Sequence, residues 1–326
     1  MDIAERHRTQ AIQHDSRALG TTKVAHVFMF PGQGSQTPDL ESKVRAWAPD
    51  LARHAVDALG DDVFRSVDTR LLQPAIYCAG IAGWRRSKKA DVGDPAAIVG
   101  HSLGELAALA AAGVISHADG LDLVITRGQL MWDAAQRLPG GGMMAILGCD
   151  GEQVYALARR LGLTVATDNA PGEVVLAGRS DTLNEAANQL ADSGAKAVVL
   201  PIEGAFHSPE MDIVRAEFED AVRSVPWSSP SCPVYSSHTG FEFDDIATGL
   251  GASLVGSVQW RTTLLRLQSS GFHSFVDCGP GHVLAKLVRR TLGRNAIALD
   301  DLNDDELTDT EPGASTRTPR KVGASS

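Results

Sequence analysis

One serine stands between two glycines in "AAIVGHSLGELAALAAAG", residues 96–113, after an apolar run and before an alanine-rich run. The first run predicts a short buried strand, and the second predicts a helix because it consists mainly of good helix formers. A serine at such a strand-to-helix turn can act as a nucleophile, since the turn exposes its hydroxyl and helix N–H groups favour negative charge. The alternative is that Ser102 only caps the helix. The strand and helix on either side favour the nucleophile.

A serine nucleophile needs a general base, and the chain has ten histidines. His101 is adjacent to Ser102 but would point elsewhere if Ser102 lies on a sharp turn. His207 stands in "EGAFHSPEM", where we expect the chain to cross a crevice between two domains. His207 is therefore the best-placed candidate, although any one of these side chains can be an ordinary surface or core imidazole. The remaining candidates are His238, His273 and His282.

Arg127 lies in "DGLDLVITRGQLMWDAAQ", where the apolar positions share one face of a predicted helix. The arginine falls at the edge of that face and needs an anionic partner there. One interpretation is a side chain that reaches solvent or pairs with a nearby acid. The other is a bidentate clamp on a substrate carboxylate, for which the guanidinium fork is well suited.

The stretch "PGQGSQ", residues 31–36, follows an apolar run and begins like a dinucleotide-binding fingerprint. Thr37 replaces the third glycine of that fingerprint, and a proline follows. A glycine-rich turn can also present backbone N–H groups to an oxyanion, which agrees better with a serine nucleophile.

Predicted strands and helices alternate along the chain. Strands expected at residues 24–30, 96–99 and 274–278 each run into a glycine-containing turn. In a parallel sheet these turns share the carboxyl edge where ligands bind, so we expect all three to face one crevice. Residues 143–201 have a different pattern, β-α-β-β-α-β, which is typical of a ferredoxin-like unit. The sequence therefore predicts a large α/β domain with a small inserted domain.

Composition narrows the class of protein. With 326 residues, 43% of them hydrophobic, the chain can bury a large core, and its net charge of −10 argues against nucleic-acid binding. The four cysteines are widely separated and show no metal-ligand spacing, so we expect reduced thiols, no metal site and a cytoplasmic protein. No apolar run reaches the roughly 18 residues of a membrane helix. Residues 302–326 combine acidic residues with Gly, Ser, Thr and Pro, which predicts a disordered tail.

Seven motifs occur in one order: "FPGQGSQ", "GHSLGE", "RGQLM", "NAPGEVVLAG", "GAFHS", "SVQW" and "GPGHVL". In this combination the chain, over about residues 24–300, resembles malonyl-CoA:acyl carrier protein transacylases and the acyltransferase domains of polyketide synthases. The resemblance implies an α/β-hydrolase-like large domain with a parallel sheet, residues 24–138 and 208–301, and an inserted ferredoxin-like small domain, residues 139–207. Residues 1–23 would then form an N-terminal extension.

The resemblance also implies a ping-pong transfer. Ser102 would attack the thioester of malonyl-CoA with His207 as its base, and the phosphopantetheine thiol of an acyl carrier protein would then take the malonyl group. Arg127 would bind the free carboxylate of the malonyl group. Backbone N–H groups of Gln33 and Leu103 would form the oxyanion hole. No bound cofactor is expected, since coenzyme A enters as a thioester substrate, and the expected partners are the carrier protein and other components of a synthase.

Three further residues match the family's site. The backbone carbonyl of Gln259 would orient His207 in place of a carboxylate, Asn169 would lie near the active site, and Phe206 would leave little room for an α-methyl branch. The last point favours malonyl over methylmalonyl groups. Two departures accompany them: serine replaces a more usual proline in "SVQW", and Gly204 replaces a histidine in "GAFH".

Two other functions stay open from the sequence. A proofreading hydrolase would use the same serine and histidine but release the acyl group to water, and the retained Arg127 argues against it. A non-catalytic docking module of a synthase would be expected to have lost Ser102 or His207. Docking of an acidic carrier protein would need a basic surface, for which there are two candidates: Arg85, Arg86, Lys88 and Lys89, or Arg289, Arg290 and Arg294.

Overall fold

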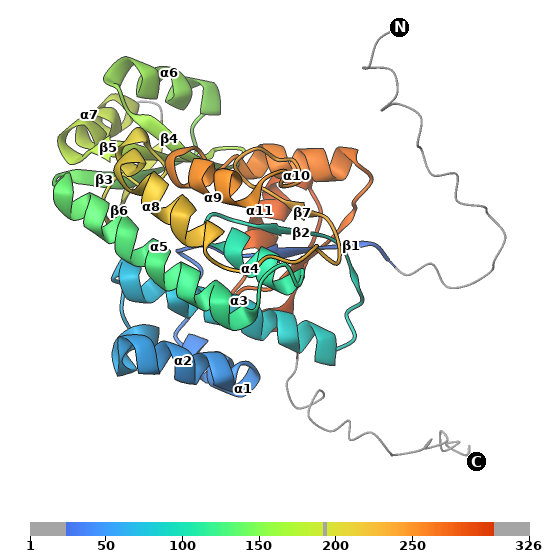
Figure 1. The fold of residues 1–326 in the computed structure, drawn as a ribbon. Coiled ribbons are helices and arrows are strands. Elements are labelled where there is room, and N and C mark those ends of the chain that lie inside the picture. The colour runs from blue at the N-terminus through green and yellow to red at the C-terminus, as the bar shows by residue number, and fades with distance from the viewer. Residues whose placement is uncertain (1–23, 192–193, 303–326) are drawn as a thin grey trace, which may run out of the picture.

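The computed structural model describes residues 24–191 and 194–302 of the chain. These residues form a large domain around a parallel sheet and a smaller unit built on a second sheet (Figure 1). The predicted N-terminal extension, residues 1–23, lies outside the described residues, and so does the predicted tail beyond Leu302.

The large sheet has five parallel strands in the order β7-β2-β1-β8-β9. Three of them are the strands that the apolar runs predict, and β1 is buried at every position because helices cover both faces of the sheet. The two edge strands were not predicted, since two residues each are too few to produce a pattern. The strands are β1 His26–Phe30, β2 Pro95–Gly100, β7 Val234–Tyr235, β8 Ser274–Asp277 and β9 Ile297–Ala298.

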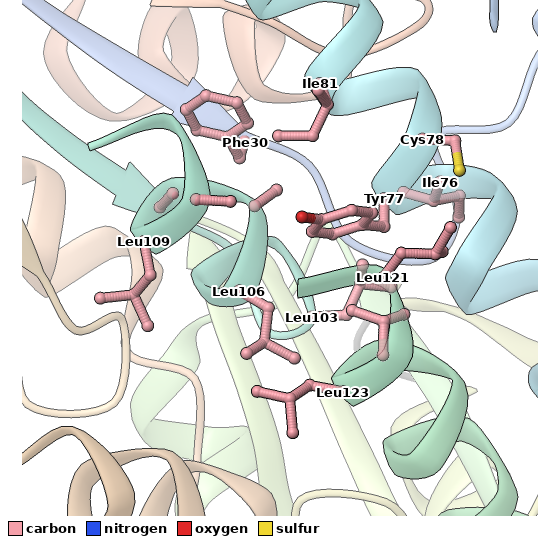
Figure 2. Close-up of a cluster of buried hydrophobic side chains, with 14 of the residues drawn as sticks. Phe30, Ile76, Tyr77, Cys78, Ile81, Leu103, Leu106, Leu109, Leu121 and Leu123 are labelled. Atoms are coloured by element: carbon pink, nitrogen blue, oxygen red, sulfur yellow. The ribbon is translucent and has the colours of Figure 1, made fainter. Parts of the chain in front are cut away.

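Alternate residues of β1 pack into two separate apolar clusters. Phe28 and Phe30 point toward α3, α4 and α5, where Tyr77 and Leu106 belong to the same cluster (Figure 2). Val27 and Met29 point the other way and pack with residues of α10 and α11. The helices of the large domain are α1 Leu40–Trp47, α2 Pro49–Leu59, α3 Thr69–Lys89, α4 Gly104–Ala111, α5 His117–Arg137, α8 Asp212–Arg223, α9 Ile246–Val255, α10 Trp260–Ser269 and α11 Val283–Leu292.

The inserted segment forms an antiparallel sheet in the order β4-β5-β3-β6, with the chain order β-α-β-β-α-β that the sequence predicts. This is the strand order of a ferredoxin-like unit. One face of the sheet packs on its own two helices, and the other contributes apolar side chains such as Met143 and Val175 to the main core. The elements are β3 Gly141–Leu147, α6 Gly151–Leu161, β4 Thr164–Ala170, β5 Glu173–Arg179, α7 Ser180–Leu190 and β6 Lys196–Glu203.

Strand β4 is also bonded to the large domain. The backbone N–H of Val258 donates to the carbonyl of Ala166, and the N–H of Asp168 donates to the carbonyl of Val258, both at 2.9 Å. The buried Asp168 carboxylate pairs with Arg261 of α10 at 2.7 Å. The hydroxyl of Ser257, the residue that replaces a more usual proline, donates to the carbonyl of Val165. These bonds hold the small sheet beside the segment that leads into α10.

Two glycines of the "GHSLG" turn are required by close backbone contacts. A Cβ added at Gly104 would lie 2.2 Å from the carbonyl oxygen of Phe30, and one added at Gly100 would lie 2.0 Å from the carbonyl carbon of Gly104. Neither neighbour can move without separating β1, β2 and α4. We expect Gly104→Ala to lower the free energy of unfolding in a urea titration by about 4 kcal/mol or more.

Gly151→Ala is the matched control for this prediction. Gly151 begins α6, and a Cβ added there meets nothing within 4 Å. We expect its free energy of unfolding to stay within about 0.5 kcal/mol of the parent protein. Equal stability of the Gly104→Ala and Gly151→Ala variants would contradict the steric explanation.

Candidate active site

Ser102 occupies a tight turn at the carboxyl end of β2. Its φ is +53°, a left-handed conformation that is rare for a residue with a side chain. The backbone N–H of Gly104 donates to the carbonyl of His101, and the N–H of Glu105 donates to the carbonyl of Ser102, each at 3.0 Å. Helix α4 therefore starts directly after the serine, whose side chain lines the cavity between the two sheets.

The structure brings Ser102 and His207 together. Their Oγ and Nε2 atoms are 2.7 Å apart, although the residues are 105 positions apart in the sequence. His207 is buried, with φ at +57°, and its Nδ1 lies 2.9 Å from the carbonyl oxygen of Ser253 and 3.2 Å from that of Gly256. Because carbonyl oxygens only accept hydrogen bonds, Nδ1 carries the proton. The Ser102 hydroxyl therefore donates to Nε2, which is the arrangement that a general base requires.

The prediction that the carbonyl of Gln259 orients His207 is wrong in this structure. That carbonyl accepts instead from the backbone N–H of Thr263 at 2.9 Å and from its hydroxyl at 2.8 Å, because Gln259 is the residue at which α10 begins. The acceptors for His207 lie at the end of α9, where the last carbonyls have no partner within the helix. The sequence gives no chemical signal for them, since a backbone carbonyl belongs to every residue.

Burial sets the protonation state of the histidine. Desolvation, followed by the positive charge of Arg127, lowers the pKa of His207 to about 3. The imidazole is therefore neutral near pH 7 and ready to accept a proton. Desolvation also lowers the pKa of His101, which is half-buried.

This shift predicts the pH dependence of both activity and stability. With a folded-state pKa of about 3, His207 stays neutral between pH 8 and about pH 5, so we expect rapid-quench rates of serine acylation to show no fall near the ordinary histidine value of about 6.5. The unfolded chain gains a proton at that value and the folded chain does not. His207 thus contributes a loss of stability as the pH falls from about 6.5 toward 3, with a slope of about 1.4 kcal/mol per pH unit.

Urea titrations of the parent protein and His207→Gln at several pH values isolate this contribution, because other buried histidines remain in both chains. The variant should lose stability less steeply on acidification. Identical slopes, or an acylation rate that halves near pH 6.5 in the parent protein, would contradict the lowered pKa.

Arg127 projects from α5 into the same site. The side chain is buried, with one guanidinium nitrogen 3.2 Å from Ser102 Oγ and another donating to Gln73 Oε1. Burial lowers its pKa to about 10, and the nearby Glu105 opposes that shift, so the guanidinium is charged at neutral pH. Within the described residues its hydrogen bonds go to neutral groups, which leaves the charge suited to an anionic ligand.

Gln73 was missed by the sequence analysis. It lies in α3, is fully buried, and its Nε2 donates to the hydroxyl of Thr69 at 2.9 Å. That hydroxyl donates to Gln33 Oε1 at 3.3 Å, so a chain of hydrogen bonds runs from the first glycine turn through α3 to Arg127. The sequence signal that could have identified Gln73 is a polar glutamine within the apolar stretch "LLQPAIYCAGIAGW".

Gln33 and Leu103 lie on the two turns that flank Ser102. Gln33 lines the cavity, and Leu103 is the first residue of the turn into α4. Within the described residues, neither backbone N–H has a hydrogen-bond acceptor. Two free N–H groups beside a serine hydroxyl are what an oxyanion requires.

Asn169 connects the small sheet to the serine turn. Its Oδ1 accepts from His101 Nε2 at 2.9 Å, and its Nδ2 donates to Glu173 Oε1 at 3.1 Å. Glu173 is in turn ion-paired with Arg290 of α11. The residue expected near the active site therefore joins three elements: the turn after β2, the start of β5 and α11.

A cavity of about 310 Å³ extends from Ser102 and His207 between the two sheets. Phe206 and Met131 are buried in its wall beside the dyad, and the small sheet supplies most of the remaining apolar surface. A side chain at Gly204 would collide with the Phe206 ring, with its Cβ 2.9 Å away, which explains the departure at that position. The apolar lining residues include Leu72, Met143, Ala145, Val175, Leu200, Ile202 and Leu287.

The third glycine turn meets this cavity at its helical end, because Val283 and Leu284 of "GPGHVL" line it, whereas Gly279 and Gly281 do not. The N–H of Gly281 in "GPGHVL" donates to Asp300 Oδ2 at 2.8 Å, on the side of the segment that follows β9. Helix α11, which follows that turn, reaches the cavity through Val283, Leu284 and Leu287. The other histidine candidates, His238, His273 and His282, do not line it.

The two basic segments differ in the structure. In "WRRSKK" the Arg86 side chain is buried against the carbonyls of Leu299 and Leu302, and Arg85 is paired with Asp50. In the second segment, Arg290 reaches Glu173, which lines the cavity. The second segment is therefore the one next to the site.

Comparison with known proteins agrees with this geometry. A family model described as "Acyl transferase domain" matches residues 53–308. The chain belongs to the acyl transferase family. A malonyl CoA-acyl carrier protein transacylase of Salmonella typhimurium is 31% identical over 283 residues, which cover 81% of this chain and 91% of the relative. The polyketide biosynthesis protein ThaF of Burkholderia thailandensis is 37% identical over 84% of this chain, which spans 25% of that protein.

Solved structures of acyl transferases share the fold. An acyl-carrier-protein S-malonyltransferase from Burkholderia pseudomallei superposes with a TM-score of 0.80 at 31% identity, covering 87% of this chain and 100% of that one. A malonyl-transacylase solved in complex with a type II polyketide synthase acyl-carrier protein superposes with a TM-score of 0.78 at 27% identity, covering 87% and 98%. Over the described ranges, no cluster of three or more metal-binding side chains is found, and no helix is long and apolar enough to cross a bilayer.

Proposed function

We propose that this acyl transferase moves a malonyl group from malonyl-CoA to the phosphopantetheine thiol of an acyl carrier protein, in fatty-acid or polyketide synthesis. The observation that carries the proposal is the position of Arg127, whose guanidinium lies 3.2 Å from the hydroxyl that His207 activates. An acyl group on that oxygen would have a fixed positive charge beside it. Relatives named as malonyl CoA-acyl carrier protein transacylases support the same reaction.

In the first half-reaction, Ser102 Oγ attacks the thioester carbonyl while His207 Nε2 takes the hydroxyl proton. The backbone N–H groups of Gln33 and Leu103 hold the negative charge of the tetrahedral intermediate. The carbon–sulfur bond then breaks, and the imidazolium gives its proton to the departing thiolate of coenzyme A. The malonyl group remains as an ester on Ser102.

In the second half-reaction the same groups work in reverse. The phosphopantetheine thiol loses its proton to His207 and attacks the serine ester, and the proton returns to Ser102 Oγ as the ester bond breaks. The carbonyls of Ser253 and Gly256 accept from Nδ1 throughout, so the ring keeps its orientation and tautomer. The reaction uses coenzyme A as a substrate thioester.

Two side chains select the acyl group, one at its free carboxylate and one at its α-carbon. Arg127 binds the free carboxylate, and the side-chain oxygen of Gln73 accepts a hydrogen bond from the same guanidinium. Phe206 is 2% exposed, and its ring packs beside the dyad, where it would collide with an α-methyl branch. We therefore propose malonyl as the preferred group over methylmalonyl.

The proposed domain limits follow the two sheets: residues 24–138 and 208–301 for the large domain, and 139–207 for the small one. Residues from both enclose the cavity. We place the reaction in the cytoplasm, because the four cysteines form no disulfide bond with one another and a reducing compartment keeps cysteines as thiols.

Incubation with malonyl-CoA, with and without a carrier protein, tests this function directly. We expect malonyl carrier protein to accumulate in step with the release of coenzyme A, with little free malonate. Release of malonate at the same rate in both arms would assign the protein as a hydrolase instead. Absence of any coenzyme A release would reject acyl transfer from this donor.

A further inference from the structure

A buried carboxylate lies beneath the dyad and takes no part in the mechanism above. Glu105 is the second residue of α4, three positions after Ser102, and is 1% exposed. Its Oε1 accepts from the backbone N–H of Ser237 at 2.7 Å and from the hydroxyls of Ser237 at 3.0 Å and Ser236 at 3.2 Å. Hydrogen bonding by the nearby Ser253 hydroxyl also acts to lower the pKa of this carboxylate. Three donated hydrogen bonds on a carboxylate that is 1% exposed are more than helix capping requires.

Ser253 joins this carboxylate to the catalytic histidine. Its hydroxyl acts to lower the pKa of the Glu105 carboxylate by hydrogen bonding, and its own backbone carbonyl accepts from His207 Nδ1 at 2.9 Å. Ser253 stands in the last turn of α9, where the unpaired carbonyls carry the negative end of the helix dipole. The second carbonyl that accepts from His207 belongs to Gly256, the residue that caps the C-terminal end of α9.

We infer that Glu105 is the positioning carboxylate of the dyad, acting on His207 through Ser253 and the end of α9. The inference rests on the proposed function, since it assigns the role of orienting His207 as the general base. Serine hydrolases commonly place a carboxylate directly on the second imidazole nitrogen. Here the backbone carbonyl of Ser253 occupies that position on His207 Nδ1. The Glu105 carboxylate interacts with the hydroxyl of the same serine.

The charges of the site agree with this role. Glu105 is the carboxylate whose charge acts on the buried Arg127, and it offsets a guanidinium that burial would otherwise disfavour. Burial raises the pKa of Glu105, and the hydrogen bonds from the three serines oppose that rise. A negative charge in the same enclosed region also favours the imidazolium that forms when His207 takes the Ser102 proton.

Two buried serines provide the test, because the hydroxyls of both act on Glu105 and only Ser253 belongs to α9. Ser253→Ala cuts the connection between the carboxylate and the helix end, and Ser236→Ala removes a donor from the same carboxylate elsewhere. We expect Ser253→Ala to lower the rate of Ser102 acylation about tenfold with an unchanged KM for malonyl-CoA. Ser236→Ala should keep the parent rate. Equal rates in the two variants would overturn the inference.

Glu105→Gln tests whether the negative charge of Glu105 is needed, or only its contact with the Ser253 hydroxyl. The Ser253 hydroxyl can accept as well as donate, so a glutamine can keep the contact while removing the negative charge. We expect the acylation rate to fall about tenfold or more with KM unchanged. In ¹⁵N-histidine-labelled protein, the Nδ1–H resonance of His207 should shift in Glu105→Gln and Ser253→Ala and stay in place in Ser236→Ala. An unmoved resonance in the first two variants would show that Glu105 does not act on the imidazole.

The rate of labelling by a general serine reagent tests this inference independently of the proposed function. The rate at which a fluorophosphonate labels Ser102 depends on His207 but not on any malonyl group. If the parent protein fails to transfer malonyl groups, the proposed function fails, while the ratio of labelling rates between Ser253→Ala and Ser236→Ala still tests the role of Glu105. A ratio of one would reject that role.

Discussion

Ser102→Ala is expected to leave no acyl-enzyme and to lower malonyl transfer by about 10⁴-fold or more. The reason is geometric. The hydroxyl of Ser102 is the group that lies 2.7 Å from the imidazole base and beside the N–H groups of Gln33 and Leu103, which have no acceptor in the part of the chain that the structure describes. Burial raises the pKa of the Cys78 and Cys278 thiols well above the ordinary value, so they cannot take over as nucleophiles.

The measurement is a short exposure to radiolabelled malonyl-CoA without acceptor, followed by peptide mapping. The parent protein should carry one label on the peptide that contains Ser102. Ser42→Ala is the control, because Ser42 is a serine of α1 whose hydroxyl donates to the carbonyl of Asp39, away from the cavity. It should label like the parent protein. Label that persists in Ser102→Ala, or that maps to a cysteine, would rule out the serine mechanism.

The serine turn could be predicted from sequence because its constraints are local. An apolar strand, two glycines and a helix within eighteen residues allow few conformations, and the structure shows why: Gly100 and Gly104 lie where backbone from β1 and α4 leaves no space for a Cβ. The inserted β-α-β-β-α-β unit was predictable for a similar reason, since each of its elements carries its own hydrophobic period.

The contacts that complete the site depend on tertiary structure. The acceptors for His207 are backbone carbonyls at the end of α9, and their position is set by how that helix packs rather than by any side chain. Gln73 acquires its role only because α3 and α5 lie side by side. Arg86 looks like a surface cation in "WRRSKK", yet the residues after β9 fold back over it. No periodic pattern contains this information.

Arg127→Ala is expected to change which acyl group the enzyme accepts. The guanidinium is the positive group beside the Ser102 hydroxyl, and Gln73 holds it in place. Its removal leaves the malonyl carboxylate without a partner where the buried Arg127 had been, a loss of about 2–5 kcal/mol or roughly 30-fold to several thousand-fold in kcat/KM. An acetyl group has no carboxylate and should transfer at the parent rate or faster, because the vacated space is less polar.

Parallel assays with malonyl-CoA and acetyl-CoA measure this change as a ratio of kcat/KM values. Arg127→Lys serves as the matched variant: it keeps a positive charge but lacks the planar fork that can bind a carboxylate and Gln73 together, so its malonyl activity should fall between those of Arg127→Ala and the parent protein. Arg85→Ala, which removes an arginine already paired with Asp50, should keep the parent ratio. If Arg127→Ala loses both activities equally, Arg127 supports the fold of the site and does not select the malonyl group.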